Sequence, residues 1–144
     1  MIPKFRLYDQ IFKKIREVTD IDWSLGIVGT QGGAIEYELD DIELMQSTGL
    51  KDKNGVEIFE GDIVLITHKS TNYADTYWHS YAEVFRAKNG AYRIRGEHIY
   101  ETELYSNRKQ LTVAGNIYNS PELLKRERFM TTTENPELLG DEQR

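Results

Sequence analysis

The sequence contains no cysteine. Thiol nucleophiles, thiolate metal sites and disulfides are therefore excluded, and the absence agrees with a reducing compartment. The chain also lacks any run of about 20 apolar residues, the length that a membrane-spanning helix needs. Its first residues, MIPKFRLYDQ, lack the basic and apolar regions of an export signal. We expect a cytoplasmic protein without a membrane segment.

Positive charge is in deficit, with 18 Lys and Arg against 24 Asp and Glu and a formal net charge of −6. The segment EYELDDIE at 36–43 holds five carboxylates and no cation. Because phosphate contacts need clustered Lys and Arg, nucleic-acid binding is disfavoured. Short basic runs at 13–16, 92–96 and 125–128 leave a local basic face possible, although such runs are usually solvated surface.

Short runs of alternating apolar and polar residues predict a mainly β fold. We expect an N-terminal hairpin with strands Phe5 to Tyr8 and Ile15 to Ile21, although the spacing of apolar residues at 11–18 also fits a helical face. Segment 26–33 is rich in glycine but lacks the spacing of a nucleotide-binding loop, so we interpret it as a turn before another strand. Segment 40–49 is expected to be a short helical turn or irregular.

Several glycines fall at expected corners of the chain. Asn54-Gly55 is a strong hairpin signal because both residues tolerate the positive φ of a type I′ turn. Gly61 and Asp62 then lead into the apolar strand 63–67. Gly49, Asn54, Gly55, Gly61 and Asp62 are therefore interpreted as a structural turn motif. Further strands near 81–87, 91–96 and 111–118 indicate a small twisted sheet or partly open barrel.

Residues 68–80 are polar and are expected to form a long loop between strands. Tyr73, Tyr77 and Trp78 lie in this expected loop, and Tyr81 follows it. Tyrosine and tryptophan often dominate protein interfaces, so these residues are candidates for an interaction surface. An equally good interpretation is that they cover one end of the barrel, and base stacking is disfavoured by the missing cations.

The C-terminal part has helix signals. Ser120, Pro121 and Glu122 occur in the order of a helix start and predict a helix over about 121–130. Its Leu123, Leu124 and Phe129 need something to bury them, so we add them to the candidate interaction surface. We divide the chain into a β domain over 1–118 and a C-terminal helix with a flexible tail over 119–144, where NPELLG at 135–140 offers a second short turn.

Three segments, PKFRLYD, ELMQSTGLKDKNGVEIFEGDIV and VAGNIYNSPELL, occur in this order. With them the chain resembles the YopX family of small proteins associated with phages and prophages of Gram-positive bacteria, from about Pro3 to Leu124. The resemblance implies a mostly β protein with an SH3-type barrel element around EGDIV and no established activity. The QIFKK segment and the tail depart from the expected family pattern, and no catalytic residue is carried over.

Three functional hypotheses remain. The first is a non-enzymatic β-barrel module that binds a host or phage protein or assembles with itself, without a cofactor. The second is a single-strand nucleic-acid module, which requires YRIRG and the aromatic residues to share one face. The third is a metal-dependent enzyme that uses the histidines, with Asp75 between His68 and His79, and the acidic segment 36–43. The simpler expectation is that His68, His79 and His98 are exposed loop histidines.

Overall fold

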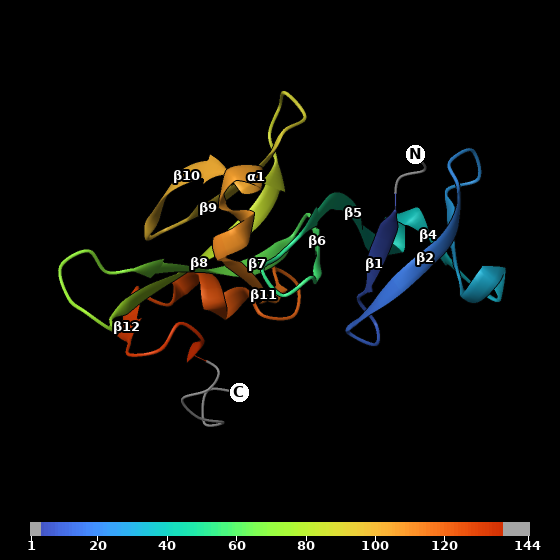
Figure 1. Ribbon diagram of the computed structural model, residues 1–144. Helices are drawn as coiled ribbons and strands as arrows, with labels where there is room; N and C mark the ends of the chain where they lie inside the picture. The colour runs from blue at the N-terminus through green and yellow to red at the C-terminus, as the bar shows by residue number, and fades with distance from the viewer. Residues whose placement is uncertain (1–3, 137–144) are drawn as a thin grey trace.

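The computed structural model describes residues 4–136, and these form a mainly β structure with two antiparallel sheets (Figure 1). The predicted mainly β fold is confirmed. Strand pairing within the described residues closes no barrel. The expected turn at 135–140 is described only at its first two residues, and the expected flexible tail after it lies outside the described residues.

The first sheet has the strand order β4-β3-β2-β1-β5-β6. Its elements, with two 3-10 helices, are β1 Phe5–Asp9, β2 Lys14–Asp22, β3 Ile27–Thr30, η1 Gln31–Gly33, β4 Ile35–Glu38, η2 Leu39–Asp41, β5 Ile42–Lys51 and β6 Glu57–Phe59. The predicted hairpin is confirmed as β1 and β2. We call residues 4–46 the N-terminal lobe.

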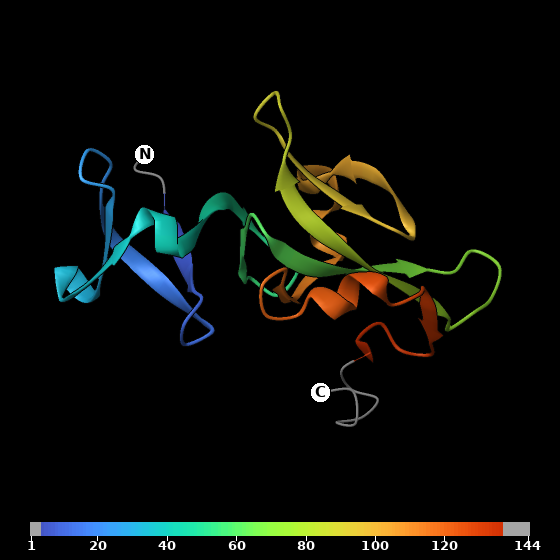
Figure 2. The ribbon, with the colours of Figure 1, turned by 180° about the vertical axis from the view of Figure 1, so that it is seen from behind.

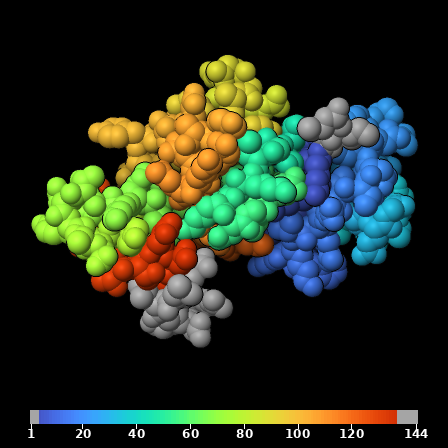
Figure 3. Space-filling view, viewed as in Figure 1, coloured from blue at the N-terminus to red at the C-terminus, as the bar shows by residue number. Residues whose placement is uncertain are grey.

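The second sheet has the order β10-β9-β8-β7-β11, and β12 pairs with β8. Its elements are β7 Asp62–Lys69, β8 Tyr77–Arg86, β9 Tyr92–Gly96, β10 Ile99–Glu103, the short helix α1 Leu104–Asn107, the 3-10 helix η3 Arg108–Gln110, β11 Leu111–Asn116, the 3-10 helix η4 Pro121–Lys125 and β12 Phe129–Thr131. We call residues 47–136 the C-terminal lobe. Figure 3 shows the two lobes side by side, with the blue and cyan N-terminal lobe at one end.

Each lobe has its own buried apolar cluster. The N-terminal cluster is small, with Leu7, Val28 and Ile42 fully or nearly buried. The larger C-terminal cluster joins the two sheets and contains Ile58, Val64, Ile66, Ala82, Val84, Ile94, Leu104 and Leu111. Ile58 belongs to β6, so the last strand of the first sheet packs into the core of the second.

The segment 40–49, expected to be a short helical turn or irregular, begins in the 3-10 helix η2, but from Ile42 onward it is a strand. β5 runs for ten residues and pairs with β1 over Ile42–Gln46 and then with β6. The register with β6 shifts between Ser47 and Lys51, where Gly49 has φ +76°. A β-bulge at a left-handed glycine explains why the local sequence does not alternate regularly.

The expected long loop at 68–80 is also shorter than predicted. β7 extends to Lys69 and β8 begins at Tyr77, so only residues 70–76 connect them. The two strands pair from Ile63↔Glu83 to Lys69↔Tyr77. Polar side chains at 68–70 and 76–80 therefore mark a hairpin that projects beyond the core, and cross-strand pairing outweighs their turn propensity.

The predicted C-terminal helix is wrong in type and length. η4 covers only five residues, and Phe129–Thr131 form the strand β12, which pairs with Tyr77–His79 of β8. Figure 2, the view from behind, shows this orange and red segment lying along β7 and β8. Ser120 makes no side-chain cap hydrogen bond, and the Phe129 ring stacks on His79 at 5.0 Å. Strand pairing with β8 thus overrides a weak local helix preference.

The hairpin at Asn54-Gly55 is confirmed, but its type I′ geometry is not. Gly55 has φ +82°, whereas Asn54 is not among the described residues with a positive φ. Asp52 organises the turn, since its Oδ1 accepts hydrogen bonds from the backbone N–H of Asn54 at 2.8 Å and of Val56 at 2.9 Å. Its Oδ2 accepts a third from the N–H of Val113 at 2.9 Å, which ties the turn to β11.

Replacing Asp52 by Ala should lower the free energy of unfolding by about 2 kcal/mol, because the partly buried N–H groups of Asn54, Val56 and Val113 lose their acceptor. Asn54→Ala, in the same turn but exposed, should change it by less than about 0.5 kcal/mol. Chemical denaturation of both variants measures the difference. Equal losses would show that the asparagine conformation, and not the Asp52 carboxylate, determines the turn.

The lobes meet at a buried ion pair. Arg6 of β1 pairs with the carboxylate of Asp62 at the start of β7, and its guanidinium lies 4.2 Å from the centroid of the Phe59 ring. Asp62 is fully buried and also accepts a hydrogen bond from the N–H of Phe59 at 2.8 Å. Asp62 was expected only as a turn residue, but it also joins β1 to the C-terminal lobe.

Candidate functional site

The structure does not bring the predicted aromatic surface together. Trp78 points to the face of β8 that continues into the core, because it alternates with Ser80 and Ala82. Tyr77 and Tyr81 occupy the opposite face of the same strand. Tyr73 lies in the hairpin loop and is exposed. These four residues therefore lie on two opposite faces of β8 and at the tip of the β7–β8 hairpin. Their role as one interaction surface stays a prediction.

Leu123 and Phe129 have partners within the chain. Leu123 lies against Gly115, and its side chain and those of Leu124 and Phe129 are half-buried. Phe129 contacts Tyr81, with ring centroids 6.2 Å apart, and carries the guanidinium of Arg126 at 4.2 Å. The sheet itself thus supplies a surface for Leu123 and Phe129.

His79 is not an exposed loop histidine. It is fully buried in β8, with Nδ1 2.9 Å from Thr67 Oγ1 and Nε2 2.7 Å from Thr131 Oγ1. Burial lowers the pKa of His79 to about 4, with a smaller effect of Lys53 and Arg126. His79 is therefore neutral near pH 7 and serves as a structural link between β7, β8 and β12.

The arginines of YRIRG lie on the face of the sheet that carries Phe85. Arg95 lies 4.0 Å from the centroid of the Phe85 ring, but its Nε is also 3.4 Å from a Glu83 oxygen. Arg93 pairs with Glu101 at 2.8 Å. Since both guanidinium groups have carboxylate partners, this face has little net positive charge to attract a nucleic-acid strand.

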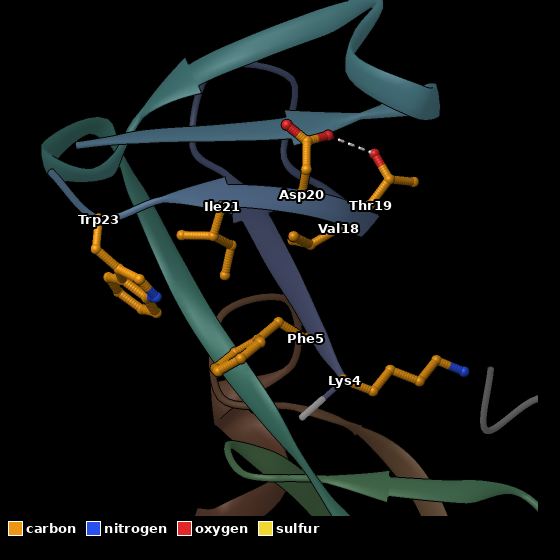
Figure 4. A pocket seen from close by; sticks show the side chains of 7 residues that line it. All are labelled: Lys4, Phe5, Val18, Thr19, Asp20, Ile21 and Trp23. Atoms are coloured by element: carbon orange, nitrogen blue, oxygen red, sulfur yellow. Dashed lines mark hydrogen bonds between the residues drawn. The ribbon is translucent and has the colours of Figure 1, made fainter. Parts of the chain in front are cut away.

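An apolar groove lies on the N-terminal lobe (Figure 4). Its volume is about 520 Å³, and its lining residues are Lys4, Phe5, Val18, Thr19, Asp20, Ile21 and Trp23. Phe5, Val18, Ile21 and Trp23 face a common space in Figure 4, and the Phe5 and Trp23 rings meet edge to face with centroids 6.3 Å apart. The groove opens beside the small N-terminal core, against which Val18 and Ile21 also pack.

A tight turn places Trp23 at the mouth of this groove. Asp22 Oδ1 accepts hydrogen bonds from the N–H groups of Ser24 and Leu25, each at 3.0 Å, and from Ser24 Oγ at 2.7 Å. These hydrogen bonds lower the pKa of the Asp22 carboxyl, and the bond from the Ser24 hydroxyl has the largest effect. The fixed turn leaves Trp23 64% exposed and Leu25 70% exposed.

Polar groups at the edge of the groove are already paired. Lys4 Nζ lies 2.9 Å from Glu57 Oε1, and this hydrogen bond raises the pKa of Lys4. Asp20 accepts a hydrogen bond from Thr19 Oγ1 at 2.9 Å, as Figure 4 shows. The free binding capacity of the groove is therefore mainly apolar.

Sequence reasoning missed this groove because it searched the long aromatic segment near residue 78. One local signal was present. In DWSLG, at 22–26, two large apolar residues occupy a turn made of aspartate, serine and glycine. A turn of this kind exposes its side chains, so such residues are rarely both buried.

Two features of residues 4–136 bear on the other hypotheses. That part of the chain contains no group of three or more His, Asp or Glu side chains placed to hold a metal ion. His68 and His79 occupy neighbouring positions of β7 and β8 but opposite faces of the hairpin. Within the same residues, no helix is long and apolar enough to cross a membrane.

Comparisons with known proteins agree with the architecture. No curated protein matches the chain. Among solved structures, the crystal structure of protein EF1440 from Enterococcus faecalis is similar, with 31% sequence identity, a TM-score of 0.59 and coverage of 86% of this chain and 99% of that chain. The model of the family described as YopX protein matches residues 4–125. The chain therefore belongs to the YopX family.

Proposed function

We propose that the protein is a non-enzymatic binding module that attaches a protein partner through the groove of its N-terminal lobe. The observation that carries this proposal is the apolar space between Phe5, Val18, Ile21 and Trp23 beside an undersized core. An apolar side chain of a partner would extend that core. Tryptophan at such a position is the residue type most enriched among the strongest contacts of protein interfaces.

Exposed apolar residues at the ends of β2 support the same lobe as the contact region. Ile11 and Phe12, in the β1–β2 turn, are 82% and 68% exposed. Asp9 holds this turn, since its Oδ1 accepts hydrogen bonds from the N–H groups of both residues. Together with Trp23 and Leu25 they leave apolar side chains in water at both ends of the strand, which is typical of interaction sites.

The charge of the N-terminal lobe indicates the chemistry of the partner. Residues 4–46 contain nine carboxylates against five lysine and arginine residues. A partner segment with an apolar anchor flanked by basic residues would match this surface. The partner would come from a host cell, from a phage or prophage, or from a second copy of the chain.

We also propose that the C-terminal lobe is an SH3-type element. Support comes from β6, which follows the Asn54-Gly55 turn and places Ile58 in the core of the β7–β11 sheet. The two sheets thus wrap around one core at this point.

The test compares captures from a host lysate by the tagged chain, by Trp23→Ala and by Tyr105→Ala, with and without nuclease. Tyr105 is the matched control because it is an aromatic residue of the other lobe with a similar exposed fraction, 60%. We expect a partner protein that is recovered equally with and without nuclease. The unmodified chain and the control variant should both capture it, whereas Trp23→Ala should recover at least about tenfold less. Equal recovery on all three baits would remove the groove from the proposal.

Sedimentation of the purified chain separates self-assembly from binding to another protein. A dimer that Trp23→Ala converts to monomer would identify a second copy as the occupant of the groove. A dimer that persists in Trp23→Ala would place self-assembly elsewhere on the chain. Recovery of nucleic acid that nuclease removes, independent of Trp23, would favour the nucleic-acid hypothesis instead.

A further inference from the structure

A second hollow lies on the C-terminal lobe, where the core face of β7 and β8 emerges beside the β9–β10 hairpin. Its volume is about 320 Å³, within the range of sites for small ligands. The side chains used below are His68, Trp78, Ser80, His98, Thr102 and Arg128. They come from β7, β8, β10, the β9–β10 turn and the segment before β12, so the hollow exists only in the folded lobe.

Among residues 4–136, no carboxylate lines this hollow, although the chain has a net charge of −6. The carboxylate next to Tyr100 and Thr102 in the chain is Glu101, and it pairs with Arg93 at 2.8 Å instead. Glu97 adjoins His98 in the hairpin turn but does not line the hollow. The hollow is therefore a local region of donors and positive charge in an acidic protein, which suits an anion.

The guanidinium of Arg128 is available to bind an anion. Its guanidinium lies 4.0 Å from the centroid of the Trp78 ring. Within residues 4–136, no carboxylate lies within ion-pair distance of this guanidinium. Contact with an indole face leaves the in-plane N–H donors of an arginine available, and their fork matches two oxygens of a phosphate group.

Hydroxyl groups on the floor of the hollow add donors. Ser80 is buried and lines the hollow, so its hydroxyl is a neutral group available to a bound ligand. Thr102 Oγ1 accepts a hydrogen bond from Asn107 Nδ2 at 3.3 Å, which leaves the hydroxyl hydrogen free to donate. The imidazoles of His68 and His98 approach from two different elements and supply further N–H donors.

We propose that this hollow binds the phosphate group of a nucleotide, with Arg128 as the main anion contact and Ser80 and Thr102 as neutral donors. The base would stack on an aromatic ring at the rim of the hollow. Two rings are candidates: Tyr100, which is 96% exposed, and Trp78, which is half-buried. This site is distinct from the groove of the N-terminal lobe and uses none of its residues.

The test is calorimetric titration of the full chain with adenosine monophosphate, inorganic phosphate and adenosine. Adenosine monophosphate should bind, phosphate should bind more weakly, and adenosine should be weaker than the monophosphate. Arg128→Gln should lower the affinity for adenosine monophosphate about 10- to 100-fold, the effect of losing a hydrogen-bonded charge. No binding of the monophosphate at millimolar concentration would overturn the proposal.

Arg126→Gln is the matched control, because Arg126 has the same charge two residues away but lies over Phe129, on the other face of β8. It should leave the affinity unchanged, and an equal loss in both variants would overturn the assignment to the hollow. A short single-stranded oligonucleotide distinguishes the source of the phosphate. Tighter binding than the monophosphate that is lost in Arg128→Gln would support the site and extend it to a strand. Trp23→Ala should change none of these affinities, so this proposal and the binding module fail independently.

Discussion

Replacing Arg6 by Met should lower the free energy of unfolding by about 3–5 kcal/mol at pH 7 to 8, the usual cost of leaving one partner of a buried ion pair alone. Asp62 is fully buried, and without Arg6 its carboxylate keeps only the hydrogen bond from the N–H of Phe59. Methionine retains most of the contact with the Phe59 ring, so the loss reports on the charge. Urea denaturation measures it.

Arg95→Met is a matched control for this experiment. Arg95 also pairs with a carboxylate, Glu83 at 3.4 Å, and also lies over an aromatic ring, Phe85 at 4.0 Å. Its ion pair is exposed, so the expected loss is below about 1 kcal/mol. A cost for Arg6→Met no larger than for Arg95→Met would mean that water reaches Asp62 and that the pair does not hold the lobes together.

The double variant Arg6→Met, Asp62→Asn tests the explanation further. Asparagine can still accept the hydrogen bond from Phe59 but carries no charge to desolvate. We expect it to recover at least about half of the loss of Arg6→Met, because neutral replacements of both partners cost less than removal of one. A double variant as unstable as the sum of the single variants would instead indicate that each side chain acts through packing alone.

Local sequence signals were sufficient for the strands that pair with their neighbours in the chain. The β1–β2 hairpin, the strand 63–67 within β7 and the turn before β6 follow from alternation and from turn residues. They failed for β5, which serves both lobes in turn and bends at Gly49. They failed again for the C-terminal helix, because the choice between helix and strand depends on β8, about 50 residues earlier.

The sites were harder to predict than the strands, for the same physical reason. The groove and the hollow each join segments that the sequence separates, and the Arg6–Asp62 pair spans 56 positions. No local pattern marks a residue whose partner lies that far away. The aromatic cluster near residue 78 was visible in the sequence, but strand alternation divides it between two faces, so its apparent unity came only from closeness along the chain.

The unfolding free energy of the unmodified protein should change little between pH 4.5 and 6, because two buried groups have opposite effects there. Burial raises the pKa of Asp62 to about 6 from 3.8, an increase that Arg6 limits and Asp52 adds to. The folded state therefore holds more protons than the unfolded state in this range, and stability falls as the pH rises. Burial lowers the pKa of His79 to about 4 from 6.5. The unfolded state holds that extra proton, and stability rises with pH.

Single variants should expose the two effects. In Asp62→Asn only His79 remains, so stability should fall on acidification by about 1 kcal/mol per pH unit. In His79→Gln, where the amide can still bond to Thr67 or Thr131, stability should rise on acidification by a similar amount. Hydrogen bonds lower the pKa values of Asp9, Asp22 and Glu57 from their ordinary values of 3.8, 3.8 and 4.5, so these groups act mainly at the acid end of this range, and there they make stability rise with pH in every variant.

Denaturation curves at intervals of half a pH unit measure these slopes. The absolute stabilities of the variants do not enter, because each slope is compared within one variant. Slopes of the same sign in Asp62→Asn and His79→Gln would contradict the opposite proton balances and would show that one of the two side chains is hydrated. Opposite slopes, with a nearly flat profile for the unmodified chain, would show that Asp62 at the junction of the lobes and His79 in the β7–β8–β12 link contribute oppositely to the pH dependence of stability.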